Sequence, residues 1–369
     1  MIKVLQVIGS LNYGGIESVI MNYYRHIDRN EVQFDFITTS GGGRFEDEIR
    51  ELGGNIFCLP SKSRQPFGYM KQLKKIIKEN KYDIVHSNTN SASAFLDLYP
   101  AKKAGCKVRI AHSHNTNCLV KWQHRIFKPL LPTVTTHRFA CSDAAAKWLF
   151  GGNKNYTIIN NGIDFDKFAF NSQKRNEVRT RLNWNDDFVI GNVASFQERK
   201  NQKFLVEILP ELAQQVPNVK LVLVGQGSTQ ESLKQLSIEL NVSDKIEFLG
   251  ARNDVDELLQ AFDVFCFPSL YEGLAVAYIE AAVSGLPVII SDGVPYVSVT
   301  DALYRLPLDK KQWIDKIVQI CKADTPRRIF TESEKTYTGF NIHDLAKSLQ
   351  NYYYDMVKSH TTTDKEEER

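Results

Sequence analysis

The sequence lacks the features that mark several common classes of protein. No stretch approaches 18 consecutive apolar residues, so we expect no membrane-spanning helix. The first residues, MIKVLQVIGS, have no basic lead and no long apolar core, and they predict a strand rather than a signal peptide. The six cysteines form no CxxC pair, and the eight histidines have no HExxH pattern or cysteine partner. We therefore expect reduced cysteines, a cytoplasmic protein and no metal site.

What the sequence does have is the composition and rhythm of a two-domain α/β protein. Its 369 residues are 43% hydrophobic and 24% charged, as in ordinary globular proteins. Short apolar strands such as KVLQVI, DIVHSN, KLVLVG and VFCFPS alternate with amphipathic segments, and the alternation occurs twice. A polar stretch after NNGIDF interrupts it, which places a boundary near residue 165. We predict two doubly wound domains, 1–165 and 166–340, a helix at 341–358 that crosses back to the first, and a disordered tail at 360–369.

Positive charge is concentrated in the first domain. Residues 1–165 carry 22 Lys and Arg against 13 Asp and Glu, whereas the rest of the chain carries 24 against 30. The segment KQLKKIIK, at residues 71–78, contains four lysines. They lie opposite an apolar set at helical spacing that starts before the segment and consists of Phe67, Met70, Leu73 and Ile77. This helix either has a solvated basic face or lies on an anionic membrane surface. Nucleic acid is not expected, because no binding motif is present.

In the first domain, two loops that follow strands contain candidate site residues. Gly14 and Gly15 precede a helix whose N-terminal N–H groups favour an anion, although for a Gly-Gly pair taken alone a plain turn is the better explanation. The segment IAHSHNT places His112, His114 and Asn115 at the end of another strand, which favours a polar pocket. Ligands of open α/β sheets bind beyond the carboxyl ends of the strands, so these residues are candidates for a ligand site.

The second domain has three such loops. In the first loop, Arg199 and Lys200 either hold phosphate oxygens or belong to an ordinary charged loop. In the second loop, Gly225 and Gly227 permit a tight turn and close approach by a ligand. The third loop leads into YEGLAVAYIEAAVSGLP, with Glu272 before a helix and Glu280 inside it. Unpaired buried carboxylates are costly, so packing alone explains this pair of acids poorly. A pyrophosphate at the helix N-terminus with a sugar and a ribose beside the two acids explains them better.

At this point the sequence resembles a known family. EGLAVAYIEAAVSGLP resembles the E-x7-E signature of family 4 retaining glycosyltransferases, which have the GT-B fold of two Rossmann-like domains facing across a cleft. NYGGIES, RIAHSHNT, RKNQKFLVEILPEL, VLVGQGS and DVFCFPSLYEGL follow in that family's order. The match covers roughly residues 1–300, and it is closest to bacterial enzymes that build capsular or exopolysaccharide units.

The resemblance implies a role for each candidate residue. Glu272 would contact sugar hydroxyls, Glu280 the ribose, and Lys200 the diphosphate of a nucleotide-sugar donor, most often UDP-linked. His114 would take the pocket position of the first domain. The remaining donor-binding positions implied are Gly14, Gly15, Arg199, Gly225, Gly227, Gly273, Leu274, Ala275 and Val276.

The sequence also departs from the family pattern. Ala194 and Ser195 stand where the family has Gly-Arg, so an arginine expected on the diphosphate is missing and Arg199 is the available substitute. Ala275 replaces a common proline, and Asn88 stands where a second histidine often occurs.

The resemblance implies retaining transfer of a hexose or N-acetylhexosamine from a UDP-sugar to a glycan or undecaprenyl-diphosphate-linked acceptor. No cofactor is implied, and no Asp-x-Asp dyad is placed to hold a metal. We expect a bacterial enzyme that is cytoplasmic or peripheral on the inner face of the membrane. Two alternatives remain open: a non-catalytic partner subunit, which the Ser195 departure favours, and a phosphorylase-like enzyme, which lacks a motif for its cofactor lysine.

Overall fold

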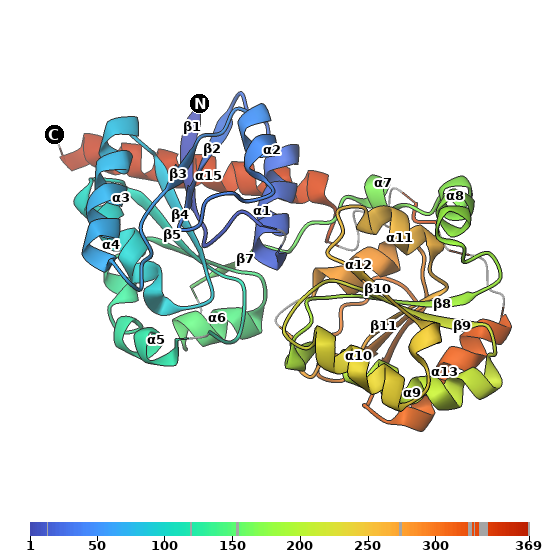
Figure 1. Cartoon of the computed structure of the whole chain (residues 1–369). Helices are drawn as coiled ribbons and strands as arrows, with labels where there is room; N and C mark the ends of the chain where they lie inside the picture. Colours follow the sequence, from blue (N-terminus) through green and yellow to red (C-terminus); the bar gives the residue numbers. More distant parts are fainter. Residues whose placement is uncertain are drawn as a thin grey trace. The chain divides into compact units, whose positions relative to one another are not determined.

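The computed structural model of the chain divides into two compact units (Figure 1). Unit 1 comprises Met1–Gly162 and Gly339–Arg369, and unit 2 comprises Ile163–Thr338. The boundary that we expected at residue 165 lies beside this division. The structure describes residues 1–12, 14–118, 120–152, 155–272, 275–323, 327, 329–331 and 339–367, and side chains only as far as residue 359.

Unit 1 is built on a seven-stranded parallel sheet in the order β3-β2-β1-β4-β5-β6-β7. Its central strands are largely apolar and buried, as expected for a sheet covered by helices on both faces, and its two edge strands are partly exposed. They are β1 (Ile2–Val7), β2 (Val32–Thr38), β3 (Ile56–Cys58), β4 (Ile84–Thr89), β5 (Val108–Ser113), β6 (His137–Ala140) and β7 (Thr157–Ile158). The expected strands of the first half are all present.

The helices of unit 1 differ from the sequence prediction in two places. They are α1 (Gly15–His26), α2 (Glu46–Glu51), α3 (Pro66–Asn80), α4 (Phe95–Lys103), α5 (Lys121–Phe127), α6 (Asp143–Phe150) and α15 (Ile342–Glu367). In α3, Phe67 is 82% exposed and does not pack with Leu73 and Ile77, because it lies in the first turn at the edge of the buried face. The helix α15 packs on α1 and continues through residues 360–367, where we had expected a disordered tail.

Unit 2 repeats the architecture with a six-stranded parallel sheet in the order β10-β9-β8-β11-β12-β13. The strands are β8 (Phe188–Val193), β9 (Val219–Val224), β10 (Ile246–Gly250), β11 (Val264–Phe267), β12 (Val288–Ser291) and β13 (Leu303–Leu306), of which β13 was not predicted. The helices are α7 (Phe165–Phe168), α8 (Ser172–Leu182), α9 (Gln202–Gln215), α10 (Gln230–Glu239), α11 (Val255–Ala261), α12 (Val276–Val283) and α13 (Lys310–Ala323).

Both sheets are doubly wound, which confirms the predicted fold class. The strand order reverses between β1 and β4 in unit 1 and between β8 and β11 in unit 2. In open α/β sheets the ligand lies beyond the carboxyl ends of the strands at this reversal. The loops after these four strands are therefore the first places to look for a site. Within the described part of the chain, no helix has the length and apolarity needed to cross a bilayer.

Candidate functional site

In unit 2, the loops after β8 and β11 are bonded to each other. The amide of Leu270 donates to the carbonyl of Arg199 over 2.8 Å, and Asn201 Nδ2 donates to the carbonyl of Pro268 over 3.2 Å. Asn201 has a positive φ of 52°, which ends the short 3-10 turn Glu198–Lys200 and starts α9. The two loops therefore hold their side chains in a fixed relation.

Lys200, Arg199 and Glu272 meet where these loops join. Lys200 Nζ lies 2.6 Å from Glu272 Oε1, and an Arg199 guanidinium nitrogen lies 2.9 Å from Glu272 Oε2. Lys200 and Glu272 expose only 11% and 7% of their side chains, and the ammonium also lies 4.8 Å from the centre of the Phe267 ring. The structure thus brings together three residues that the sequence singled out, with two cations for one carboxylate.

The electrostatics of this cluster favour an added anion. Burial lowers the pKa of Lys200, and the charge of Glu272 opposes that shift only in part. Glu272 Oε1 touches the ammonium but has no aligned hydrogen bond among the described residues. An oxygen of this kind still has capacity for a hydroxyl donor, and the two cations still have capacity for phosphate oxygens.

The helix α12 starts at Val276, four residues beyond Glu272. Its N-cap residue, Ala275, is extended and provides no side-chain cap, and its first turn carries no acidic residue. No side chain caps the N–H groups that begin at Val276, and their contact with an anion stays a prediction. Gly273 and Leu274 lie outside the described residues.

Glu280 is the fifth residue of α12, and the sequence did not predict its charged neighbours. Burial raises the pKa of its carboxyl to about 7, the charge of Lys167 lowers it in part, and the charge of Asp256 raises it further. Lys167 and Asp256 come from α7 and α11 and lie 3.5 Å apart. The acid is therefore close to half protonated at neutral pH, and a ligand that donates hydrogen bonds would favour its charged form.

The two glycines after β9 lie directly against the protein backbone. A Cβ on Gly227 would lie 2.2 Å from the carbonyl oxygen of Phe196, and one on Gly225 would lie 1.9 Å from that of Ala194. The close approach that we expected from a ligand is therefore made by the loop after β8. Both residues shape that loop, and their direct contact with a ligand stays a prediction.

In unit 1, the Gly-Gly turn carries an acid of its own. Gly14 is the extended N-cap of α1, and a Cβ there would meet the Glu17 carboxylate, which accepts a hydrogen bond from Ser10 over 3.1 Å. Burial raises the pKa of Glu17. A Cβ on Gly15 would meet nothing within 4 Å, so the turn is open at that residue.

His114 lies in a buried polar cluster at the ends of β4 and β5. Its Nε2 is 3.0 Å from Asn88 Oδ1, its ring is 3.9 Å from that of His112, and burial lowers its pKa to about 3. The cluster also includes Tyr353 of α15, which no local pattern connects with these strands. His114 is therefore a neutral imidazole at neutral pH.

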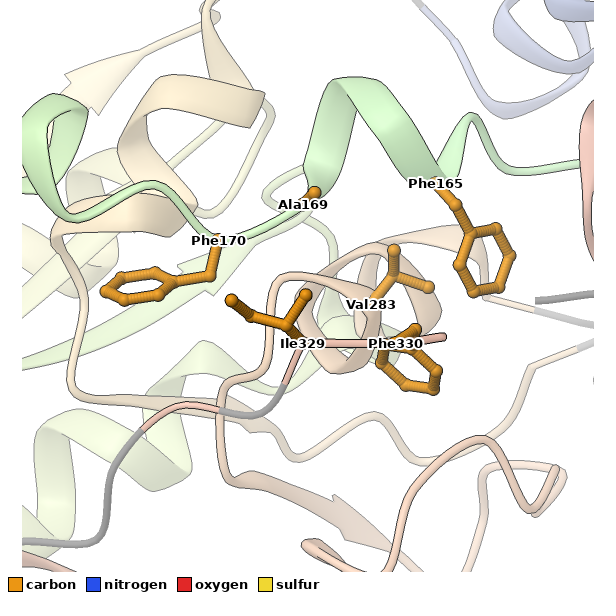
Figure 2. Close-up of a pocket in the computed structure, with 6 residues that line it drawn as sticks. All are labelled: Phe165, Ala169, Phe170, Val283, Ile329 and Phe330. Carbon is orange, nitrogen blue, oxygen red and sulfur yellow. The ribbon is translucent and has the colours of Figure 1, made fainter. Parts of the chain in front are cut away.

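Two other features of the structure do not fit a donor site. Figure 2 shows the side chains that line a pocket of unit 2. The pocket has a volume of about 40 Å³, and all its lining side chains are apolar, so it offers nothing to a phosphate; the lining residues are Phe165, Ala169, Phe170, Val283, Ile329 and Phe330.

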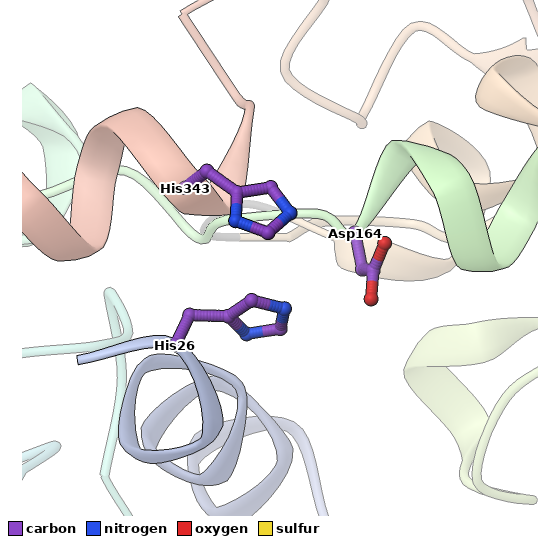
Figure 3. Close-up of side chains that lie close together, drawn as sticks. All are labelled: His26, Asp164 and His343. Atoms are coloured by element: carbon purple, nitrogen blue, oxygen red, sulfur yellow. The ribbon is translucent and has the colours of Figure 1, made fainter. Parts of the chain in front are cut away.

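Figure 3 shows His26 of α1 and His343 of α15, whose rings pack edge to face with centres 4.8 Å apart. His26 Nδ1 lies 2.8 Å from the carbonyl of Asn22, which can only accept, so that nitrogen carries a proton.

Comparisons with known proteins agree with this geometry. The family model described as "Glycosyltransferase Family 4" matches residues 13–167, and the one described as "Glycosyl transferases group 1" matches residues 174–320. The chain is 34% identical over 371 residues to the putative glycosyltransferase EpsF of Bacillus subtilis, covering 95% of this chain and 96% of that protein. It is 25% identical over 375 residues to a UDP-Gal:alpha-D-GlcNAc-diphosphoundecaprenol alpha-1,3-galactosyltransferase of Escherichia coli, covering 93% and 94%.

Solved structures share the fold. A glycosyltransferase from Rickettsia africae aligns over 97% of this chain and 99% of its own, with a TM-score of 0.80 and 17% identity. Anabaena HepE in complex with UDP-glucose aligns over 98% and 100%, with a TM-score of 0.75 and 18% identity. Likeness to solved glycosyltransferases of this kind shows that the chain has the GT-B fold of two Rossmann-like units.

Proposed function

Because the chain belongs to the family 4, group 1 glycosyltransferases and has their GT-B fold, we propose that it transfers a sugar from a nucleotide donor to a growing bacterial polysaccharide. The observation that carries this proposal is the cluster of Lys200, Arg199 and Glu272 beside the uncapped start of α12. It combines cations for a diphosphate with a carboxylate oxygen for a sugar hydroxyl. The product class follows from relatives such as the Staphylococcus aureus capsular polysaccharide biosynthesis glycosyltransferase CapH, which is 27% identical over 368 residues.

The donor under this proposal is a UDP-linked hexose or N-acetylhexosamine. The E. coli relative is named for a UDP-sugar, and it covers nearly the whole chain. Glu280 accepts hydrogen bonds from the ribose and Glu272 from the sugar. Arg199 takes the place of the arginine that family members carry at the position of Ser195, since its guanidinium reaches the same carboxylate as Lys200.

The chemistry that this site supports is electrostatic. As the bond between sugar and diphosphate breaks, negative charge develops on the departing oxygen, and Lys200, Arg199 and the N–H groups of α12 stabilise it. The acceptor hydroxyl attacks from the face that the diphosphate leaves, and its proton passes to the diphosphate, so configuration is retained. Neither glutamate acts as a nucleophile in this scheme.

The transfer needs no metal. The chain has two Asp-x-Asp patterns, at residues 164–166 and 254–256, and other groups of the same chain donate hydrogen bonds to an aspartate of each. Asp164 accepts two backbone N–H bonds at the start of α7, and Asp254 accepts a forked pair of hydrogen bonds from Arg252. Oxygens used in this way are poor candidates for holding a divalent cation on a diphosphate.

The acceptor is a glycan carried on a lipid diphosphate, and unit 1 contacts the membrane that holds it. The E. coli relative's name contains such an acceptor. On α5 and the turn after it, Trp122, Ile126 and Leu130 are exposed at four-residue intervals and Lys121 and Arg125 lie beside them. Apolar side chains that insert and basic ones that pair with anionic lipid are what an interfacial helix needs. The protein is then cytoplasmic and peripheral on the inner face of the membrane.

The test is thermal stabilisation of the purified protein by a panel of nucleotides and nucleotide sugars. A ligand that binds only the folded state raises the melting temperature by mass action. We expect UDP and one UDP-sugar to raise it, and the same UDP-sugar to be consumed when a lipid-linked acceptor is present. Stabilisation without any transfer would instead favour a non-catalytic partner subunit that retains the donor site. Silence across the whole panel would contradict the donor site itself.

A further inference from the structure

Two histidines from opposite ends of the chain meet in unit 1. His26 is the last residue of α1, and His343 is the second residue of α15, the helix that packs on α1. Figure 3 shows the two rings beside each other, with their centres 4.8 Å apart. Metal-binding motifs are recognised in a sequence by ligands at short spacing, so a pair that is brought together only by the packing of two distant helices escapes them.

The ring of His26 has the proton arrangement of a metal ligand. Its Nδ1 donates to the main-chain oxygen of Asn22 over 2.8 Å, because that oxygen can only accept. In the neutral ring the lone pair therefore lies on Nε2. Histidines that bind metals are commonly oriented in this way, with the other ring nitrogen bonded to a main-chain oxygen or a carboxylate.

The two rings are close enough to share one ion. One ring nitrogen of His26 lies within 4.8 Å of one ring nitrogen of His343. A zinc ion that both nitrogens bind at about 2.0–2.1 Å in tetrahedral geometry holds them about 3.3 Å apart. The hydrogen bond to Asn22 fixes the ring of His26, whereas His343 is exposed on the first turn of α15 and can rotate to close that difference.

The ligand atoms decide which ions the pair can take. Imidazole nitrogen suits Zn²⁺, Ni²⁺ and Cu²⁺, whereas Mg²⁺ and Ca²⁺ require oxygen ligands. Because His343 is exposed, water can fill the remaining positions around the ion. Structural zinc sites usually have four protein ligands, so two histidines predict binding of modest affinity.

We propose that His26 and His343 bind a divalent transition-metal ion such as Zn²⁺, which links the end of α1 to the start of α15. The link holds the last helix of the chain on unit 1. The Gly14–Gly15 turn lies at the other end of α1, roughly 17 Å away along the helix, so this ion has no part in the transfer. The inference is independent of the proposed function.

The first arm of the test measures metal binding by protein that a chelator has stripped. Isothermal titration calorimetry should detect binding of Zn²⁺ and Ni²⁺, and both ions should raise the melting temperature, because they bind the folded state. Mg²⁺ and Ca²⁺ at the same concentration should do neither. No binding of Zn²⁺ and Ni²⁺, or an equal response to Mg²⁺, would overturn the proposal.

The second arm locates the ion. His343→Asn removes one ligand from an exposed position, and it should weaken Zn²⁺ binding about tenfold or more, since even the loss of an outer partner of a metal ligand costs that much. The matched control is His137→Asn in β6, which should bind Zn²⁺ as the original protein does. Unchanged Zn²⁺ affinity in the His343 variant would place the ion elsewhere, for example on the exposed thiol of Cys58, and would refute the site. His26→Gln tests the same pair from the other side, so the result does not depend on the folding of one variant.

Discussion

Replacing Glu280 with glutamine should make unit 2 more stable and its donor site weaker. The carboxyl has an ordinary pKa of 4.5 and a pKa raised to about 7 in the folded protein, chiefly because it is buried. From pH 4.5 to 7 the unfolded chain loses this proton and the folded chain keeps it, so the group's contribution to stability falls as pH rises through that window and is constant above it. The neutral amide of Glu280→Gln has no such dependence.

The size of the effect follows from the shift. Each pKa unit corresponds to about 1.4 kcal/mol, so the full gap sets an upper limit of roughly 3 kcal/mol, and we expect about 1–3 kcal/mol above pH 7. At pH 4.5 the variant and the original protein should have similar stability. The assay is urea unfolding of both proteins at pH 4.5, 6 and 8, with Glu231→Gln on the exposed face of α10 as the control.

The same variant should bind its donor less tightly. A charged carboxylate accepts hydrogen bonds from ribose hydroxyls more strongly than an amide does, by about 1 kcal/mol, so the dissociation constant should rise about fivefold. A variant that is less stable than the original at pH 8 would refute the account of Glu280 as a strained buried acid. Unchanged donor affinity would refute only its ribose contact.

Four further outcomes are expected. Lys200→Ala should lower kcat by about 10²–10³, because a charged group that faces the leaving diphosphate is lost. The control is Lys203→Ala, which changes an exposed lysine on the next helix and should leave kcat unchanged. Equal effects of the two changes would contradict the role assigned to Lys200. EDTA should leave turnover intact, and loss restored by a divalent cation would contradict the metal-free scheme. Trp122→Ser should weaken flotation with anionic vesicles about tenfold, whereas Ile238→Ser, which changes an equally exposed side chain of unit 2, should not. If the unmodified protein does not float at low salt, the membrane proposal is wrong. Finally, His86, His112 and His114 have pKa values lowered chiefly by burial, so the unfolded chain binds more protons below pH 6.5 and unit 1 should lose stability between pH 7 and 5.5. Urea unfolding measures this loss, and a flat profile would contradict their neutral state.

Local patterns were sufficient to predict the parts of the fold that repeat. Valine- and isoleucine-rich runs bounded by glycine and proline identify almost every strand, because buried parallel strands need that composition. The strand β13 was missed since LYRL at 303–306 is short and half polar, and it is a strand only because β12 is there to pair with it. Phe67 was assigned to the buried face for the opposite reason, since its spacing fits a helix whose first turn has nothing to pack against.

The candidate site was predicted in its residues and not in its contacts. Motif order identified Lys200, Glu272 and Glu280, but no pattern indicates that Lys167 and Asp256, from two other helices, set the charge of Glu280. The sequence likewise predicted a tight turn at Gly227 but gave no sign that the backbone at Phe196 lies against this glycine. Contacts between distant segments decide such details, and spacing along the chain does not record them.

The arrangement of Glu272 between two cations explains how such a cluster can be both stable and ready for its substrate. Without a donor, the carboxylate holds Lys200 and Arg199 together, which offsets part of the cost of burying the charges. Under the proposed function, a diphosphate that binds would take over the cations from the carboxylate, and Glu272 would exchange one cation contact for a sugar hydroxyl. The charges are then already dehydrated and oriented when negative charge develops on the leaving group, so little reorganisation is required. The proposal assigns the role of the arginine missing at position 195 to Arg199, which is already bonded to the same carboxylate.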